Sequence, residues 1–365
     1  MKILAITASY PHITNEYSGI FVKNTLQELA KLGNEIVVIA PQKFHKKRMP
    51  FFQEENNLKV YRPTYISFSA KNILGFNTIR LTHESFEESI FKSIRKIDFK
   101  ADVIYSHFLL PAGNTAIKIG SKLNKKVYCT LGESDILGYE RIYKQEYLFS
   151  IYNKFEKIFP NSPVIKNELV IKYKLDTEKI EFIPNGVDIN KFYPMDKSEC
   201  RDKLNLQKQE KIVLFIGGFI ERKGPFRVIE ACRMLKKIPK MIFIGSGFPI
   251  PQDDNVIFSG IVAHDMLPLY INACDVFVLP TKNEGMPNVI LEAMACNIPI
   301  VTSNIEVNKL ILEKYENKKL CKFNDVGCIS KAIEELLIRD KKNVNQFKYT
   351  LQSRVEKIFQ NMAVN

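Results

Sequence analysis

The sequence predicts an α/β protein with two Rossmann-like domains, and two observations carry this prediction. Near the start, an apolar run at residues 2–7, a helical pattern at 22–32 and a second apolar run at 35–40 follow one another. This is the strand–helix–strand order of a parallel sheet. The same order begins again with an apolar run at 211–216 and an amphipathic helical segment after it. A chain of 365 residues is long enough for two domains that each bury a core.

The boundary between the domains is expected near Pro194, just before a charged, helix-prone segment at 197–209. We therefore assign residues 1–194 to an N-terminal domain and 195–345 to a second domain. Short apolar runs rich in β-branched residues mark the other buried strands. They lie at residues 102–107, 127–130, 158–162, 241–244, 256–260 and 275–279.

The composition, with 45% hydrophobic and 25% charged residues, is that of a globular protein and excludes a disordered one. The seven cysteines are scattered and include no C-x-x-C pair. This pattern favours reduced thiols and argues against a disulfide framework or a structural zinc site. The apolar start at 3–6 is too short for a signal peptide, and no run approaches a membrane span of about eighteen residues. We expect a cytoplasmic protein, soluble or peripheral to the membrane.

The net charge of +13 is spread over both halves of the chain. No helix-turn-helix, zinc-finger or RNP-like motif accompanies it, so we do not expect a nucleic-acid partner. A basic protein without such a motif can instead meet an anionic membrane or a phosphate-bearing substrate.

One segment, residues 41–53, combines basic and aromatic side chains. They are Lys43, Lys46, Lys47 and Arg48 with Phe44, Phe51 and Phe52. Cations meet anionic head groups and rings enter the interface, so this mixture suits a peripheral membrane contact. A solvated loop with a few packed phenylalanines is the alternative.

The most informative stretch is 279–301, where a strand end, an acidic turn, a helix and the next strand follow without spare residues. Pro280 closes the strand, and Pro287 is expected at the first helical position, where a missing N–H costs nothing. The helix start then points toward the carboxyl edge of the sheet, which is where open α/β sheets bind anionic ligands.

Glu284 and Glu292 lie in this stretch, the first outside the helix and the second inside it. Each carboxylate can accept two hydrogen bonds from a vicinal diol, so the pair can hold different ends of one elongated ligand. The alternative for either residue alone is a solvated glutamate.

The spelling EGMPNVILEAMA closely resembles the E-x7-E signature of the retaining, family-4-type glycosyltransferases of the GT-B fold. The resemblance implies two Rossmann-like domains facing across a cleft, with the acceptor in the first domain and the donor in the second. It implies that Glu284 addresses the donor sugar and Glu292 the ribose. It also implies that the segment 346–365 is a helix crossing back to the first domain. Asn297 stands where the family usually has glycine.

The resemblance assigns a donor site to the second domain. Lys223 matches the family's lysine, but Gly218 occupies the place of its arginine, and Arg222 is the substitute that we expect beside the diphosphate. The remaining donor-binding residues implied are Ser246, Gly247, Ile261, Val262, Gly285, Met286, Pro287 and Asn288. On the acceptor side it implies Gly19, His107, Glu133 and Asp135. Either Glu133 or Asp135 takes the place of a histidine that this sequence lacks.

The resemblance thus implies a hexosyltransferase. It would move a sugar from a nucleotide-diphosphate donor, with UDP expected, to a lipid-linked or saccharide acceptor in cell-surface polysaccharide synthesis. No Asp-x-Asp pair is present, and we expect neither a metal nor another cofactor. Three alternatives stay open: a transferase with a small soluble acceptor, a GT-B-type nucleotide-sugar epimerase, and a catalytically weak nucleotide-sugar-binding partner subunit.

Overall fold

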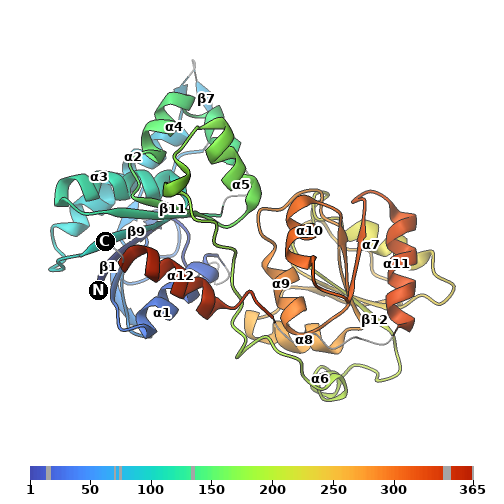
Figure 1. Ribbon diagram of the computed structural model, residues 1–365. Helices are drawn as coiled ribbons and strands as arrows, with labels where there is room; N and C mark the ends of the chain where they lie inside the picture. The colour runs from blue at the N-terminus through green and yellow to red at the C-terminus, as the bar shows by residue number, and fades with distance from the viewer. Residues whose placement is uncertain (14–17, 70, 74–75, 133–135, 340–346, 364–365) are drawn as a thin grey trace. The chain divides into compact units, whose positions relative to one another are not determined.

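The computed structural model describes the whole chain except residues 14–17, 70, 74–75, 133–135, 340–346 and 364–365. It forms two compact units (Figure 1). Unit 1 comprises Met1–Pro184 with Arg354–Asn365, and unit 2 comprises Asn185–Ser353. Each unit contains its own sheet with helices packed on it, which confirms the predicted α/β class.

Unit 1 is built on a seven-stranded sheet, parallel except at one edge. In spatial order the strands are β11 (Lys157–Pro160), β10 (Val127–Leu131), β9 (Val103–His107), β1 (Lys2–Thr7), β2 (Glu35–Ile39), β5 (Leu58–Tyr61) and the antiparallel β4 (Phe52–Glu55). Strand order reverses between β1 and β9, so the chain leaves these two neighbours in opposite directions. A reversal of this kind opens a crevice at the carboxyl ends of the strands.

The helices of unit 1 follow the strands in chain order. They are α1 (Ile20–Lys31), α2 (Ile79–Ile94), α3 (Asn114–Leu123), α4 (Gln145–Tyr152) and α5 (Pro163–Asn167). The last helix, α12 (Leu351–Ala363), contributes its residues from Arg354 onward to this unit. Arg354 is buried and donates to the carbonyls of Ile183 and Pro184 at 2.8 and 2.6 Å. These bonds anchor the end of the chain in unit 1.

Unit 2 has a six-stranded sheet in which every pair is parallel. The spatial order is β14 (Val256–Gly260), β13 (Lys240–Ile244), β12 (Ile212–Ile216), β15 (Val276–Leu279), β16 (Ile300–Ser303) and β17 (Lys318–Cys321). Its helices are α6 (Lys197–Lys203), α7 (Pro225–Arg233), α8 (Leu267–Ala273), α9 (Asn288–Ala295), α10 (Glu306–Leu312) and α11 (Val326–Ile338). The central strands are fully buried, as parallel strands covered on both faces must be. The order reverses between β12 and β15.

The prediction that all seven cysteines are reduced thiols is wrong at one place. Cys321 ends β17 and Cys328 lies in the first turn of α11, and the two form a disulfide. The chain turns back between them, so their Cα atoms lie 5.8 Å apart. Nothing in the sequence indicated this pair, because the two cysteines do not have C-x-x-C spacing. The other five cysteines are buried and lie outside any disulfide.

None of the helices in the described residues is both long enough and apolar enough to cross a membrane.

Candidate functional site

Two loops meet at the reversal point of unit 2, one after β12 and one after β15. The N–H of Lys282 donates to the carbonyl of Arg222 at 2.8 Å, which ties the loops together. Gly224 caps α7 in the left-handed conformation, with φ 78°, and a Cβ there would lie 2.7 Å from the Pro280 carbonyl oxygen. Glycine is therefore required where the two backbones approach.

The predicted residues Lys223, Arg222 and Glu284 come together at this edge. Lys223 Nζ donates to Glu284 Oε1, and Arg222 Nη1 lies 3.6 Å from the same oxygen. Thr281, which is fully buried, donates its hydroxyl to that oxygen at 2.9 Å. Arg222 also donates to the Asn283 carbonyl at 2.7 Å. Two cations around one carboxylate leave the edge with an excess positive charge.

Glu292 lies on α9 and is only 7% exposed. Its Oε1 is 3.6 Å from His264 Nε2, and its Oε2 is buried with no hydrogen-bond partner among the described residues. A buried carboxylate oxygen without a partner is costly and marks a place where a ligand can supply the missing donor.

His264 is a contact that the sequence did not predict. Lys191 Nζ lies 2.7 Å from His264 Nδ1, and the ring meets Phe192 edge-on with centroids 5.7 Å apart. Because the ammonium has only donors, Nδ1 accepts and the ring proton lies on Nε2, toward Glu292. A single histidine in a loop carries no spacing signal, and only the fold brings it to α9.

The start of α9 differs from the prediction by one position. Pro287 is the N-cap, with φ −78° and ψ 100°, and the helix begins at Asn288. Proline still fits, because a capping residue also needs no N–H donor of its own. Asn288 accepts a hydrogen bond from Asn185 at 2.7 Å. Met286 is buried and Gly285 is half-buried, so the turn before α9 is packed against the unit.

The glycines after β12 and β13 have a structural reason. A Cβ on Gly245 would lie 1.9 Å from the Gly217 carbonyl oxygen, and one on Gly247 would lie 2.5 Å from that of Phe219. The Phe219 N–H donates to the Ser246 carbonyl at 2.7 Å, so the two loops cross backbone to backbone. Gly218 is different, since a Cβ there would meet nothing nearer than 3.9 Å.

Ile261 and Val262 follow the edge strand β14, and the Ile261 side chain is 62% exposed. Strands β13 and β12 separate β14 from β15 in the sheet. The predicted donor-binding residues therefore extend along the carboxyl edge of unit 2, from the end of β14 to the start of α9.

In unit 1, Gly19 and His107 lie at the carboxyl ends of the neighbouring strands β1 and β9. Gly19 caps α1 with φ 71°, and a Cβ there would lie 2.4 Å from the Ser9 backbone. His107 is 2% exposed and packs among the rings of Phe21, Tyr105 and Phe108. Its burial, helped by the charge of Arg354, lowers its pKa to about 3.

His107 is therefore neutral at physiological pH. The other two acceptor-side residues predicted, Glu133 and Asp135, lie outside the described residues.

No group of three or more His, Cys, Asp and Glu side chains that could hold a metal ion occurs in the part of the chain that the structure describes.

Two protein-family sequence models match this chain, one for each unit. The model described as Glycosyltransferase Family 4 matches residues 18–191, and the model described as Glycosyl transferases group 1 matches residues 210–339. The chain is a glycosyltransferase of the GT-B fold. Both parts of this enzyme are thus covered, the first match falling mainly in unit 1 and the second in unit 2.

The relatives of this glycosyltransferase include the putative teichuronic acid biosynthesis glycosyltransferase TuaC of Bacillus subtilis (strain 168). It is 28% identical over 330 residues, which are 84% of this chain and 81% of TuaC. The UDP-Gal:alpha-D-GlcNAc-diphosphoundecaprenol alpha-1,3-galactosyltransferase of Escherichia coli is 30% identical over 44% of this chain and 45% of its own. The solved structure of Anabaena Alr3699/HepE in complex with UDP and glucose has the same fold, with a TM-score of 0.67 and 18% identity over 98% of this chain and 94% of that one.

Proposed function

We propose that this enzyme transfers a hexose-type sugar, with retention, from a UDP-sugar to a lipid-linked or saccharide acceptor in cell-surface polysaccharide synthesis. One observation carries the proposal: the Lys223–Glu284 pair and the partnerless oxygen of Glu292 belong to the two loops and the helix at one sheet edge. The teichuronic acid role in the name of TuaC and the diphosphoundecaprenol acceptor of the galactosyltransferase support the choice of acceptor. The UDP-Gal donor of that galactosyltransferase and the UDP bound in the HepE structure support the choice of donor.

The donor diphosphate is assigned to the cations at the β12 and β15 loops. When the bond between sugar and phosphate breaks, negative charge grows on the leaving diphosphate. Lys223 and Arg222 stabilise this charge, and the first N–H groups of α9 lie at the same edge. Interactions that strengthen as this charge grows lower the barrier rather than only tightening binding.

Glu284 and Glu292 hold the two sugars of the donor. Glu284 accepts hydrogen bonds from hydroxyls of the transferred sugar, while Thr281 and Lys223 fix the orientation of its carboxylate. Glu292 accepts from the ribose with the oxygen that has no partner among the described residues. We assign no protein nucleophile, so the acceptor attacks from the face that the diphosphate leaves.

Segment 41–53 of unit 1 is the proposed contact with the membrane that carries a lipid-linked acceptor. Its rings are exposed in the structure, with Phe44 at 59%, Phe51 at 45% and Phe52 at 43%. Exposed rings beside several cations suit the head-group region of an anionic bilayer.

The experiment that tests the proposed function is an assay for nucleoside diphosphate release from UDP-sugars, with and without saccharide and lipid-diphosphate-linked saccharide acceptors. We expect release that depends on the acceptor and that falls by about 100-fold or more in Glu284→Gln. Isomerised donor without acceptor would show an epimerase instead. Nucleotide binding without turnover would show a partner subunit.

A further inference from the structure

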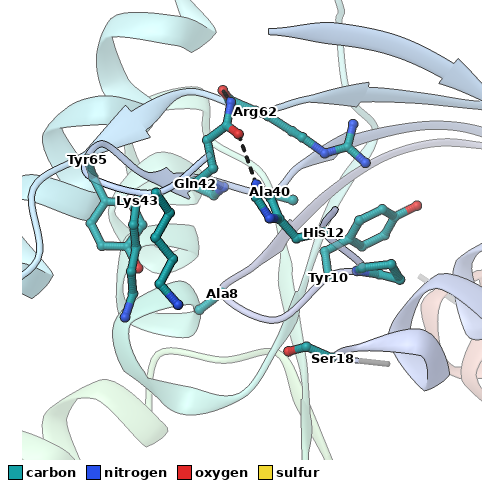
Figure 2. Close-up of a pocket in the computed structure, with 12 residues that line it drawn as sticks. Ala8, Tyr10, His12, Ser18, Ala40, Gln42, Lys43, Arg62 and Tyr65 are labelled. Atoms are coloured by element: carbon teal, nitrogen blue, oxygen red, sulfur yellow. Dashed lines mark hydrogen bonds between the residues drawn. The ribbon is translucent and has the colours of Figure 1, made fainter. Parts of the chain in front are cut away.

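A cavity of about 300 Å³ lies in unit 1, at the carboxyl ends of three adjacent parallel strands (Figure 2). Its walls come from the segments that directly follow β1, β2 and β5, including Tyr10, Gln42 and Arg62. This edge is where open α/β sheets bind their ligands. Neither Gly19 nor His107, the acceptor-side residues above that the structure describes, is among the residues that line this cavity.

Gln42 holds the cavity wall in one arrangement. It is buried, and its amide nitrogen donates to the carbonyls of Met49 and Arg62 at 2.8 and 3.0 Å. Its amide oxygen accepts from the Met49 N–H at 2.8 Å and lies 3.3 Å from His12 Nε2, the contact drawn as a dashed line in Figure 2. A fully bonded amide of this kind fixes the three wall segments relative to one another.

Two buried polar groups of the wall have no hydrogen-bond partner among the described residues. Arg62 is 2% exposed, and while its Nη2 donates to Glu55 at 2.5 Å, its Nη1 has no acceptor. Tyr10 is 7% exposed, its hydroxyl is also unsatisfied, and its ring lies 5.5 Å from the guanidinium. Figure 2 shows these two side chains next to each other at one end of the cavity.

Both groups are hydrogen-bond donors at neutral pH. Burial raises the pKa of Tyr10 above its usual value, so the hydroxyl keeps its proton. Burial would also raise the pKa of Glu55, but hydrogen bonds from Lys23 and Arg62 outweigh it and lower that pKa, so Glu55 stays ionised beside two cations. The guanidinium therefore keeps part of its positive field for the cavity.

The charged side chains among the described residues of the wall are all positive. Lys43 and Lys46 line the cavity with exposed side chains, and neither ammonium pairs with a carboxylate of the described residues. With Arg62 they supply three cations, and no Asp or Glu is among the lining residues described. Such a wall favours an anion with several oxygens over a neutral sugar.

We propose that this cavity binds the phosphate or diphosphate group of the acceptor. The assignment rests on the proposed function and specifies the acceptor as a phosphate ester. Arg62 and Tyr10 donate to its oxygens from the buried end, and Lys43 and Lys46 meet its remaining charge at the surface. A dianionic phosphate matches this set of donors better than a carboxylate, which has only two oxygens.

Isothermal titration calorimetry on the full chain tests the assignment. The enzyme is first saturated with UDP, so that the cations of the donor site do not compete for the probe. The probes are farnesyl diphosphate, farnesol as its uncharged counterpart, and inorganic diphosphate as the free-phosphate arm. We expect farnesyl diphosphate to bind and farnesol not to bind. Inorganic diphosphate binding as tightly supports a site that recognises the phosphate group alone, and binding of inorganic diphosphate without farnesyl diphosphate overturns the acceptor assignment.

Matched variants locate the binding. The double variant Lys43→Gln/Lys46→Gln is expected to weaken farnesyl diphosphate binding about tenfold. Lys47→Gln/Arg48→Gln removes the same charge from the same segment outside the cavity and is expected to change it less than about twofold. Tyr10→Phe is expected to weaken binding without lowering the unfolding temperature, since the hydroxyl has no partner in the described chain. Equal losses in the two double variants would overturn the proposal.

The same titrations separate the two possible failures. If UDP does not bind the wild type, the proposed donor function fails. If UDP binds but farnesyl diphosphate does not, the assignment of the cavity fails alone.

Discussion

Gly218 and Gly245 show how differently two glycines of one sheet edge constrain the enzyme. A Cβ on Gly245 would lie 1.9 Å from a backbone oxygen of the crossing loop, and its φ of 150° is rare for other residues. A Cβ on Gly218 would meet only ordinary contacts. The first glycine is thus required by packing, while the second leaves room for a Cβ atom.

We predict that Gly245→Ala lowers the free energy of unfolding by roughly 2–3 kcal/mol, because the loops must move apart. We predict that Gly218→Arg changes it by less than about 0.5 kcal/mol and tightens UDP binding, because it adds a cation at the diphosphate site. Urea unfolding measures the change in stability of each variant, and titration with UDP measures the change in binding for Gly218→Arg. A severely destabilised Gly218→Arg would contradict the open space at this position.

His107 predicts a pH dependence of stability. Its pKa is about 3 in the folded enzyme and 6.5 as the ordinary value, so the unfolded chain binds the proton more readily. The stability that the neutral His107 contributes is fully present above pH 6.5 and is lost as the pH falls toward 3. Lowering the pH from 7 to 5 therefore lowers the free energy of unfolding by about 2 kcal/mol through this one group.

We predict that His107→Gln reduces the stability difference between pH 7 and pH 5 by about that amount, whatever its effect on absolute stability. Urea unfolding at the two pH values gives the difference, and His45→Gln, at an exposed position, is the control. An unchanged difference in His107→Gln would mean that the ring is accessible to protons in the folded state.

At the scale of elements, the sequence predicted central strands such as β12 and β15 because each is a short apolar run that the sheet buries on both faces. It also predicted α9, whose end explains Asn297. This residue has φ 54°, a left-handed conformation that asparagine tolerates better than most residues other than glycine. Features that depend only on neighbouring residues can therefore be predicted from the sequence.

The sequence did not predict the contacts that form only when the chain folds. The approach of His264 to Glu292 and the cavity wall around Gln42 depend on strand order. The Cys321–Cys328 bond depends on how the chain turns between β17 and α11. No spacing rule in the sequence brings these residues together, so these contacts could be found only from the fold.

The segment 41–53 carries a prediction of its own. Phe44→Ser/Phe51→Ser/Phe52→Ser is expected to weaken binding to vesicles of phosphatidylglycerol and phosphatidylcholine by about tenfold or more, since exposed rings contribute apolar area at the interface. Vesicle cosedimentation measures it. The control is a triple serine variant of exposed apolar residues in unit 2, Met234, Phe248 and Ile338. Equal binding of both variants would rule out this segment as the membrane contact.

At the scale of the whole molecule, each unit has the strand reversal that creates a binding edge, and each edge carries cations. In unit 2 they surround the place proposed for the donor diphosphate. In unit 1 they line the cavity proposed for the acceptor phosphate. The net charge of +13 is therefore consistent with an enzyme whose two substrates are both anionic.

The measurement that tests the central claim most directly is the affinity for UDP of the wild type, Glu292→Gln and the exposed control Glu306→Gln. Because Glu292 is buried with a partnerless oxygen, neutralising it is expected to leave stability unchanged or raised while weakening UDP binding by about 10- to 100-fold. Glu306→Gln is expected to bind as the wild type does. Wild-type affinity in Glu292→Gln, or no UDP binding by any of the three folded proteins, would contradict the donor site at the carboxyl edge of unit 2.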